Sequence, residues 1–327
     1  MTRSALLTSL IIASGVAFAA IPPLKVTPLG KPEAPIEGTL NRNLGAEPES
    51  FSPLSSSEYA ARQAYEYAVE GLLSINPETY KWEPQLAENY EVSKDHLTYT
   101  FYLNKKAHFS DGKPVTSEDV KFSIEYVRDP AYLASHRMPY YEDVESIETP
   151  DAHTVRIKMK RKYFKNLEVL GSSGFTPILP KHVYGDPKKK FPGAPIFGSG
   201  PYKVDVYNRG KNIMLVRDKN YWGANEPGLK SLGKFERVNF RFIKEENLTL
   251  EMVKKGQIDH MWPMQIETFE KKAVGEPFGT TIKKIQAENK IPKRYGFIAW
   301  NQKDPGSKDF KPHPFSPTRT SGWRFRT

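Results

Sequence analysis

The 327-residue chain contains no cysteine. A disulfide framework, a thiolate metal site and a cysteine-linked lipid anchor are therefore excluded. The seven histidines lack the H-E-x-x-H or H-x₃-H spacing of a zinc site. They are His96, His108, His136, His153, His182, His260 and His313. We therefore expect neither a metal nor a cofactor.

Catalytic signatures are also missing. Residues 171–175, GSSGF, depart from the G-x-S-x-G nucleophile elbow because Phe175 stands at the final glycine position. Residues 198–202, GSGPY, have neither the G-x-G-x-x-G pattern nor the lysine-serine ending of a phosphate loop. Acidic pairs such as Glu245 and Glu246 are adjacent in sequence, which directs them to different faces. We expect that the chain is not an enzyme.

Long apolar runs are absent after residue 20. Residues 1–19 form an export-signal pattern, with Arg3 at the start, an apolar run over 5–16 and small residues at Ala17 and Ala19. The run is shorter than the roughly 20 apolar residues of a membrane span. We expect this signal to be cleaved and the mature protein to diffuse freely in the periplasm.

The chain carries a net charge of +10, but its positive side chains are scattered. The one tight run is Lys188 to Lys190, between Pro187 and Pro192, where the prolines favour a loop. We interpret it as a solvated surface and expect no nucleic-acid partner. A hydrophobic content of 38%, with 12% aromatic residues, indicates a folded globular protein, which we expect to be monomeric.

The most informative stretch runs from Pro84 to Pro130. Apolar and polar residues alternate over 98–103, which predicts a half-buried strand. Ser110 to Pro114 then predicts a turn, and Thr116 with Asp119 forms a near capping box. Val120, Ile124 and Val127 follow at helical spacing until Asp129-Pro130 ends the pattern.

Other segments give weaker signals. Ser57 is a plausible N-cap for a helix over 57–72. Short strands are predicted over 39–44, 213–217 and 238–243, and alternation predicts a hairpin formed by 143–147 and 154–159. Residues 248–255 fit a short helix.

Several motifs occur in one order along the chain. Residues 86–90 read LAENY, residues 99–105 YTFYLNK, residues 109–115 FSDGKPV, residues 119–123 DVKFS and residues 198–202 GSGPY. Residues 220–223, NYWG, follow later. In this order the motifs resemble family 5 of the extracellular solute-binding proteins, the peptide-binding components of ABC importers. The resemblance covers nearly all of residues 39–314.

The resemblance implies an α/β fold of the periplasmic binding protein type (type II, cluster C-like). We expect one lobe from residues 20–54 and 168–285, with a mixed α/β subdomain inserted at 55–167. Residues 286–315 would be the crossover into a second lobe that is largely missing.

The last residues, 316–327, read SPTRTSGWRFRT and lack the apolar helix that the resemblance leads us to expect there. With a suitable choice of codons, reading residues 317–327 one frame over gives Asp-Lys-Asp-Val-Arg-Val-Ala-Leu-Ser-His, which fits that helix. We therefore expect an out-of-frame tail on a truncated chain. A natural short tail is the alternative.

The resemblance also implies partners and contacts. The partners would be a peptide or other small solute, together with the permease and ATPase subunits of the importer. Candidate ligand contacts are Asn41, Asn43, Glu47, Tyr140, Trp300 and Asn301. The solute remains open, because sugar, nickel and haem binders share the architecture. A chaperone-like interaction protein is a further alternative.

Overall fold

The computed structural model describes residues 26, 31–77, 79–189, 194–261 and 264–286. The chain divides into two compact units, Met1–Pro277 and Phe278–Thr327. The export signal, Trp300, Asn301 and the tail lie outside the described residues. The division into a lobe and an inserted subdomain stays a prediction, since the chain up to Pro277 clusters as one unit.

One four-stranded sheet contains the motif-rich stretch. It is antiparallel, with the order β4 (Ala87–Val92), β5 (Thr98–Leu103), β7 (Thr154–Met159) and β6 (Val144–Asp151). The predicted strand over 98–103 and the predicted hairpin are confirmed. Alternation in β5 fails at Thr100, which is buried although it lies between the buried Tyr99 and Phe101. We call this the β5 sheet.

The capping box is present as predicted. Helix α2 (Ser117–Glu125) starts where Asp119 Oδ2 accepts the Thr116 backbone N–H at 2.9 Å and the Thr116 hydroxyl at 2.8 Å. Val120 and Ile124 are fully buried beneath it. The α-helix ends earlier than predicted, and Val127 falls in a 3-10 turn, Tyr126–Arg128.

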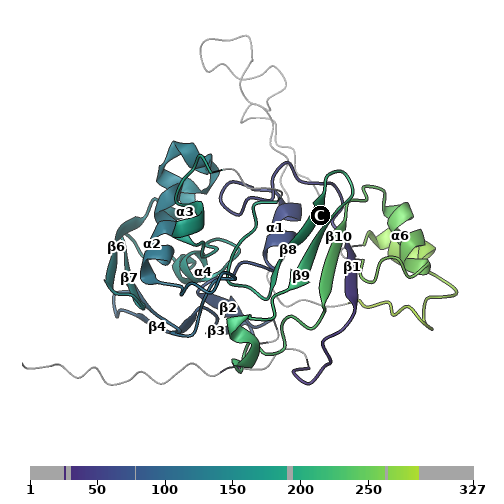
Figure 1. Ribbon diagram of the computed structural model, residues 1–327, viewed down its shortest axis with the longest axis horizontal. Coiled ribbons are helices and arrows are strands. Elements are labelled where there is room, and N and C mark those ends of the chain that lie inside the picture. The colour runs from purple at the N-terminus through teal and green to yellow at the C-terminus, as the bar shows by residue number, and fades with distance from the viewer. Residues whose placement is uncertain (1–25, 27–30, 78, 190–193, 262–263, 287–327) are drawn as a thin grey trace, which may run out of the picture. The chain divides into compact units, whose positions relative to one another are not determined.

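A second four-stranded sheet has the order β1 (Thr39–Asn43), β10 (Arg237–Arg241), β9 (Asn212–Arg217) and β8 (Tyr202–Asn208). β1 pairs in parallel with β10, and the other pairs are antiparallel. The predicted strands and the helix that became α6 (Glu246–Lys254) are confirmed within two residues. In Figure 1 this β1 sheet and the β5 sheet lie at opposite sides of the unit.

The predicted helix over 57–72 is too long. Helix α1 covers only Tyr59–Tyr65, and its N-cap is Glu58, which makes no side-chain capping bond, so Ser57 is not the cap. The reason lies beyond Tyr65, where the backbone meets other segments. A Cβ on Gly71 would lie 2.4 Å from the backbone N of Ser173, and one on Gly198 would lie 2.3 Å from the backbone O of Ala68. This close backbone approach replaces the end of the helix.

The remaining elements are short. They are β2 (Leu73–Ile75) paired with β3 (Trp82–Pro84), the helices α3 (Met138–Tyr141), α4 (Asn166–Gly171) and α5 (Lys181–Tyr184), the 3-10 turns η2 (Pro130–Tyr132), η3 (Ser135–Arg137) and η4 (Trp222–Asn225), and a single π-helical turn, η5 (Thr268–Lys272).

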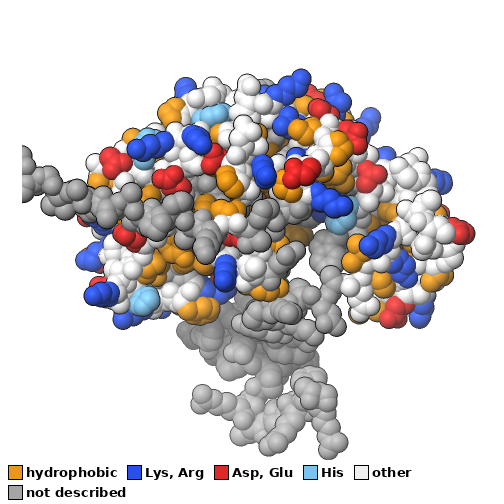
Figure 2. All heavy atoms as spheres, turned by 90° about the horizontal axis from the view of Figure 1, so that it is seen from below, with side chains coloured by type: hydrophobic (Ala, Val, Ile, Leu, Met, Phe, Trp, Pro, Cys, Tyr) orange, Lys and Arg blue, Asp and Glu red, His pale blue; other side chains and the backbone are white. Residues whose placement is uncertain are grey.

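One face of the molecule carries mixed charge. On the face shown in Figure 2, lysine and arginine side chains are interspersed with aspartate and glutamate. Such mixing does not produce the single-sign stripe expected of a nucleic-acid interface. The absence of a nucleic-acid partner nevertheless stays a prediction.

Glu70 forms a buried polar node with the NYWG motif of residues 220–223. Its side chain accepts a 2.6 Å hydrogen bond from the Tyr221 hydroxyl and a 2.9 Å bond from the Trp222 indole N–H. Glu70 is only 2% exposed. Burial raises the pKa of Glu70 from 4.5 to about 7, although the two donors act in the opposite direction. Tyr221 and Trp222 are themselves buried.

This node predicts a pH-dependent stability. Because the folded state raises the pKa of Glu70, its contribution is complete below pH 4.5 and is lost as the pH rises through about 7. Between pH 5 and pH 8 the wild-type free energy of unfolding should therefore fall more than that of Glu70→Gln, by a difference on the order of 2 to 3 kcal/mol. Urea unfolding at the two pH values measures this difference. The exposed control Glu88→Gln should follow the wild type, and parallel wild-type and E70Q profiles would contradict the assignment.

Candidate functional site

Three of the predicted contacts lie at the carboxyl end of β1. Asn41 and Asn43 are in the strand, and Glu47 follows in the loop. The carboxyl end of β10 lies beside them because the two strands run in parallel. In α/β sheets the carboxyl ends of parallel strands are the usual edge for ligands. The structure therefore brings these three residues together at a suitable place.

Asn43 is used within the protein. Its Nδ2 donates to the Ile243 carbonyl at 3.0 Å and to the Thr249 hydroxyl at 2.8 Å. Its Oδ1 accepts the N–H of Gly45 at 2.8 Å and that of Ile243 at 3.2 Å. The Asn43 side chain thus links the loop after β1, the end of β10 and helix α6 through hydrogen bonds.

Glu47 is also held from both sides. Its Oε1 accepts the Tyr207 hydroxyl at 2.6 Å, and its Oε2 accepts the Gly210 backbone N–H at 2.9 Å. Burial, followed by the Glu47 hydrogen bond and charge, raises the pKa of Tyr207 to about 12. Glu47 therefore anchors the loop to the β8–β9 hairpin, and its contact with a solute stays a prediction.

Asn41 belongs to a row of side-chain amides across the β1 sheet. Asn208 Nδ2 donates to Asn212 Oδ1 at 3.0 Å, and Asn212 Nδ2 donates to Asn239 Oδ1 at 2.7 Å. Asn239 Nδ2 donates to Asn41 Oδ1 at 3.0 Å. Asn41 Nδ2 then donates to Asp259 Oδ2 at 3.0 Å, so every bond points toward this carboxylate. We call Asn41, Asn208, Asn212 and Asn239 the amide row.

Tyr140 lies elsewhere. It is 48% exposed on α3, and its ring meets Phe175 edge-on with 5.1 Å between centroids. In Figure 1, α3 is on the opposite side of the unit from β1. The structure therefore does not group Tyr140 with the three residues at the end of β1. Its contact with a solute stays a prediction, as do those of Trp300 and Asn301, which are outside the described residues.

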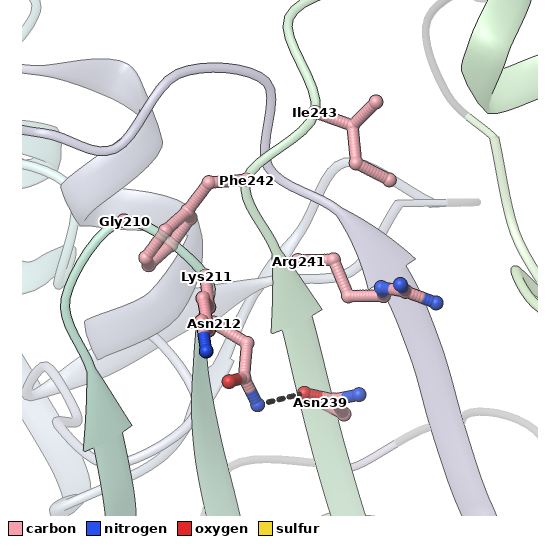
Figure 3. A pocket seen from close by; sticks show the side chains of 7 residues that line it. All are labelled: Gly210, Lys211, Asn212, Asn239, Arg241, Phe242 and Ile243. Carbon is pink, nitrogen blue, oxygen red and sulfur yellow. Dashed lines mark hydrogen bonds between the residues drawn. The ribbon is translucent and has the colours of Figure 1, made fainter.

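A hollow of about 440 Å³ opens beside the amide row. It is lined by Gly210, Lys211, Asn212, Asn239, Arg241, Phe242 and Ile243. Figure 3 shows that these residues come from the β8–β9 hairpin and the carboxyl end of β10. None of the seven was predicted from the sequence. The available signal was the polar set of the alternating strand β10, which includes Asn239 and Arg241.

Within the described ranges, no three histidine, cysteine, aspartate or glutamate side chains gather to hold a metal ion. The polar groups at the end of β1 are amides and two engaged carboxylates, Glu47 and Asp259. This chemistry suits recognition by hydrogen bonding.

Comparison with known proteins identifies the family. The family model for bacterial extracellular solute-binding proteins, family 5 (middle region), matches residues 81–316. The chain belongs to this family. The resemblance of the motifs is thereby confirmed, and the family is one of solute-binding proteins and not of enzymes, as expected.

Curated relatives and solved structures agree with the family assignment. The dipeptide-binding protein DppE of Bacillus subtilis is 26% identical over 68% of this chain and 42% of its own length. AppA, an oligopeptide-binding protein of B. subtilis solved with a nonapeptide, matches with a TM-score of 0.60 and 25% identity over 69% of this chain and 44% of its own. AgaA of A. tumefaciens R10, solved with agropinic acid, matches with a TM-score of 0.58 and 29% identity over 68% of this chain and 43% of its own.

These matches confirm the expected fold, one lobe of a periplasmic binding protein. The chain spans about two-fifths of the length of the curated relatives that it matches. In the part of the chain that the structure describes, no helix is long and apolar enough to cross a membrane.

The anchoring role of Glu47 makes a prediction about Tyr207. Replacing Glu47 by Gln removes the charge beside the phenol, so the pKa of Tyr207 should fall from about 12 toward 10. It should remain above 10 because burial persists. An NMR titration of the tyrosine ring signals measures the shift, with Tyr207→Phe to assign the signal. Glu49→Gln, in the same loop, should leave the pKa unchanged, and an unchanged value in E47Q would refute the anchor.

Proposed function

We propose that this chain forms the first lobe of a periplasmic solute-binding protein that delivers peptides to an ABC importer. The observation that carries the proposal is the family match over residues 81–316. The names of DppE and AppA, a dipeptide-binding and an oligopeptide-binding protein, favour peptides as the solute. Its partners would be the permease and ATPase subunits of the importer.

Binding would involve closure of two lobes around the peptide. A ligand that contacts both lobes only in the closed state favours that state by its differential affinity. Main-chain hydrogen bonds, with the peptide aligned like an added strand, would give affinity that is independent of side chains. The carboxyl end of β1, with Asn41, Asn43 and Glu47, is the surface of this lobe that we assign to the peptide.

A non-peptide solute is the second candidate. AgaA was solved with agropinic acid and is 29% identical to this chain over the matched part. This observation favours a small organic acid over a sugar or haem. Adding peptides and organic acids to the same protein as separate ligands distinguishes the two candidates.

The test compares two chains. One is the 327-residue chain, and the other continues in the alternative frame after residue 316. We expect a di- to nonapeptide mixture to raise the melting temperature of the longer chain and leave the short chain unchanged. The physical reason is that one lobe supplies only part of the contacts needed to offset the cost of association.

Calorimetry with single peptides then gives the affinity of the longer chain. A clear thermal shift of the short chain would contradict the need for two lobes. Binding of an organic acid, with no response to any peptide, would replace the first candidate by the second. A longer chain that binds neither class would refute the proposed function.

A further inference from the structure

The hollow at the end of β10 presents two cationic side chains. Lys211 and Arg241 line it, and none of its seven lining residues is acidic. Val238 and Phe240 are fully buried on one face of β10, so Arg241 extends from the other face, as Asn239 does. Figure 3 shows the Arg241 guanidinium at the same side of the strand as Asn239.

Two other basic side chains of this region are paired with carboxylates. Lys203 on β8 lies 3.7 Å from Asp218 and Lys254 on α6 lies 2.7 Å from Glu251. Among the ion pairs of the described residues, none involves Lys211 or Arg241. Glu47 contacts the rim at Gly210, but both of its oxygens already accept hydrogen bonds.

The amide row fixes which atoms of Asn212 and Asn239 remain for a ligand. In each amide the oxygen accepts one bond of the row and the nitrogen donates one. Flipping either amide would break both bonds, so its orientation is held. Each nitrogen keeps a second N–H. The hollow therefore combines a guanidinium, an ammonium and two oriented N–H donors.

We propose that this hollow is an oxyanion site for a carboxylate or phosphate group. The Arg241 guanidinium would bind two oxygens at once, since its planar fork matches both groups. Lys211 would add a point charge, and the amides of Asn212 and Asn239 would orient the anion. For its natural ligand the site rests on the proposed solute-binding function, and it then selects solutes that bear an acidic group. Because the hollow is open to solvent, binding should weaken as salt rises.

An NMR titration of the 327-residue chain tests the site. The probes are inorganic phosphate and succinate, added separately at constant ionic strength. We expect saturable shifts of the Arg241 Nε–H and of the Asn212 and Asn239 side-chain amides. Losing a charged hydrogen-bond donor should weaken binding about tenfold in Arg241→Gln. Lys211→Gln should weaken it as well. The tighter of the two probes identifies the acidic group.

The chain offers a matched control. Arg237 lies on the same strand and the same face as Arg241, but it does not line the hollow. Arg237→Gln removes the same charge and should change the affinity less than about twofold, as expected for an exposed distant charge. Equal weakening in R237Q and R241Q would overturn the site, because it would show attraction to overall charge. Shifts that do not saturate for either probe would overturn it too.

These outcomes are separate from those of the proposed function. If the anion titration fails while the longer chain binds peptides, only the oxyanion site is wrong. If phosphate or succinate binds at Arg241 while the longer chain binds no solute, only the proposed function is wrong.

Discussion

The parallel pairing of β1 with β10 is the constraint on which the β1 sheet depends. It joins Thr39–Asn43 to Arg237–Arg241, segments separated by almost 200 residues of chain. Closing so long a loop costs conformational entropy, which local contacts at the junction must offset. The side chains of Asn41 and Asn43 supply such contacts, to Asn239 and to Ile243. In the sequence, the β5 sheet and helix α2 thus lie between two strands that are neighbours in the β1 sheet.

Much of the fold could be predicted because its signals are local. The strand over 98–103 follows from alternation, and the start of α2 follows from the reciprocal bonds of Thr116 and Asp119. The predicted helix over 57–72 failed because Gly71 meets another backbone segment, which no local pattern records. The oxyanion hollow was missed for the same reason, since it forms only when the β8–β9 hairpin lies beside β10.

The candidate site shows how internal and ligand-facing roles differ. Asn43 and Glu47 were chosen from the resemblance, and the structure gives each of them at least two hydrogen bonds within the protein. Lys211 and Arg241 were not chosen, yet they line the hollow and form no ion pair with another described residue. Polar groups whose hydrogen bonds are formed within the protein stabilise the edge of the sheet. Polar groups without such partners are available to a solute.

The central claim is that the carboxyl ends of β1 and β10 face the bound solute. A crystal structure of the longer chain with a bound peptide tests it most directly. The peptide should lie against this edge, with Glu47 still bonded to Tyr207 and Gly210. A peptide bound away from this edge, or an edge covered by another part of the protein, would contradict the claim.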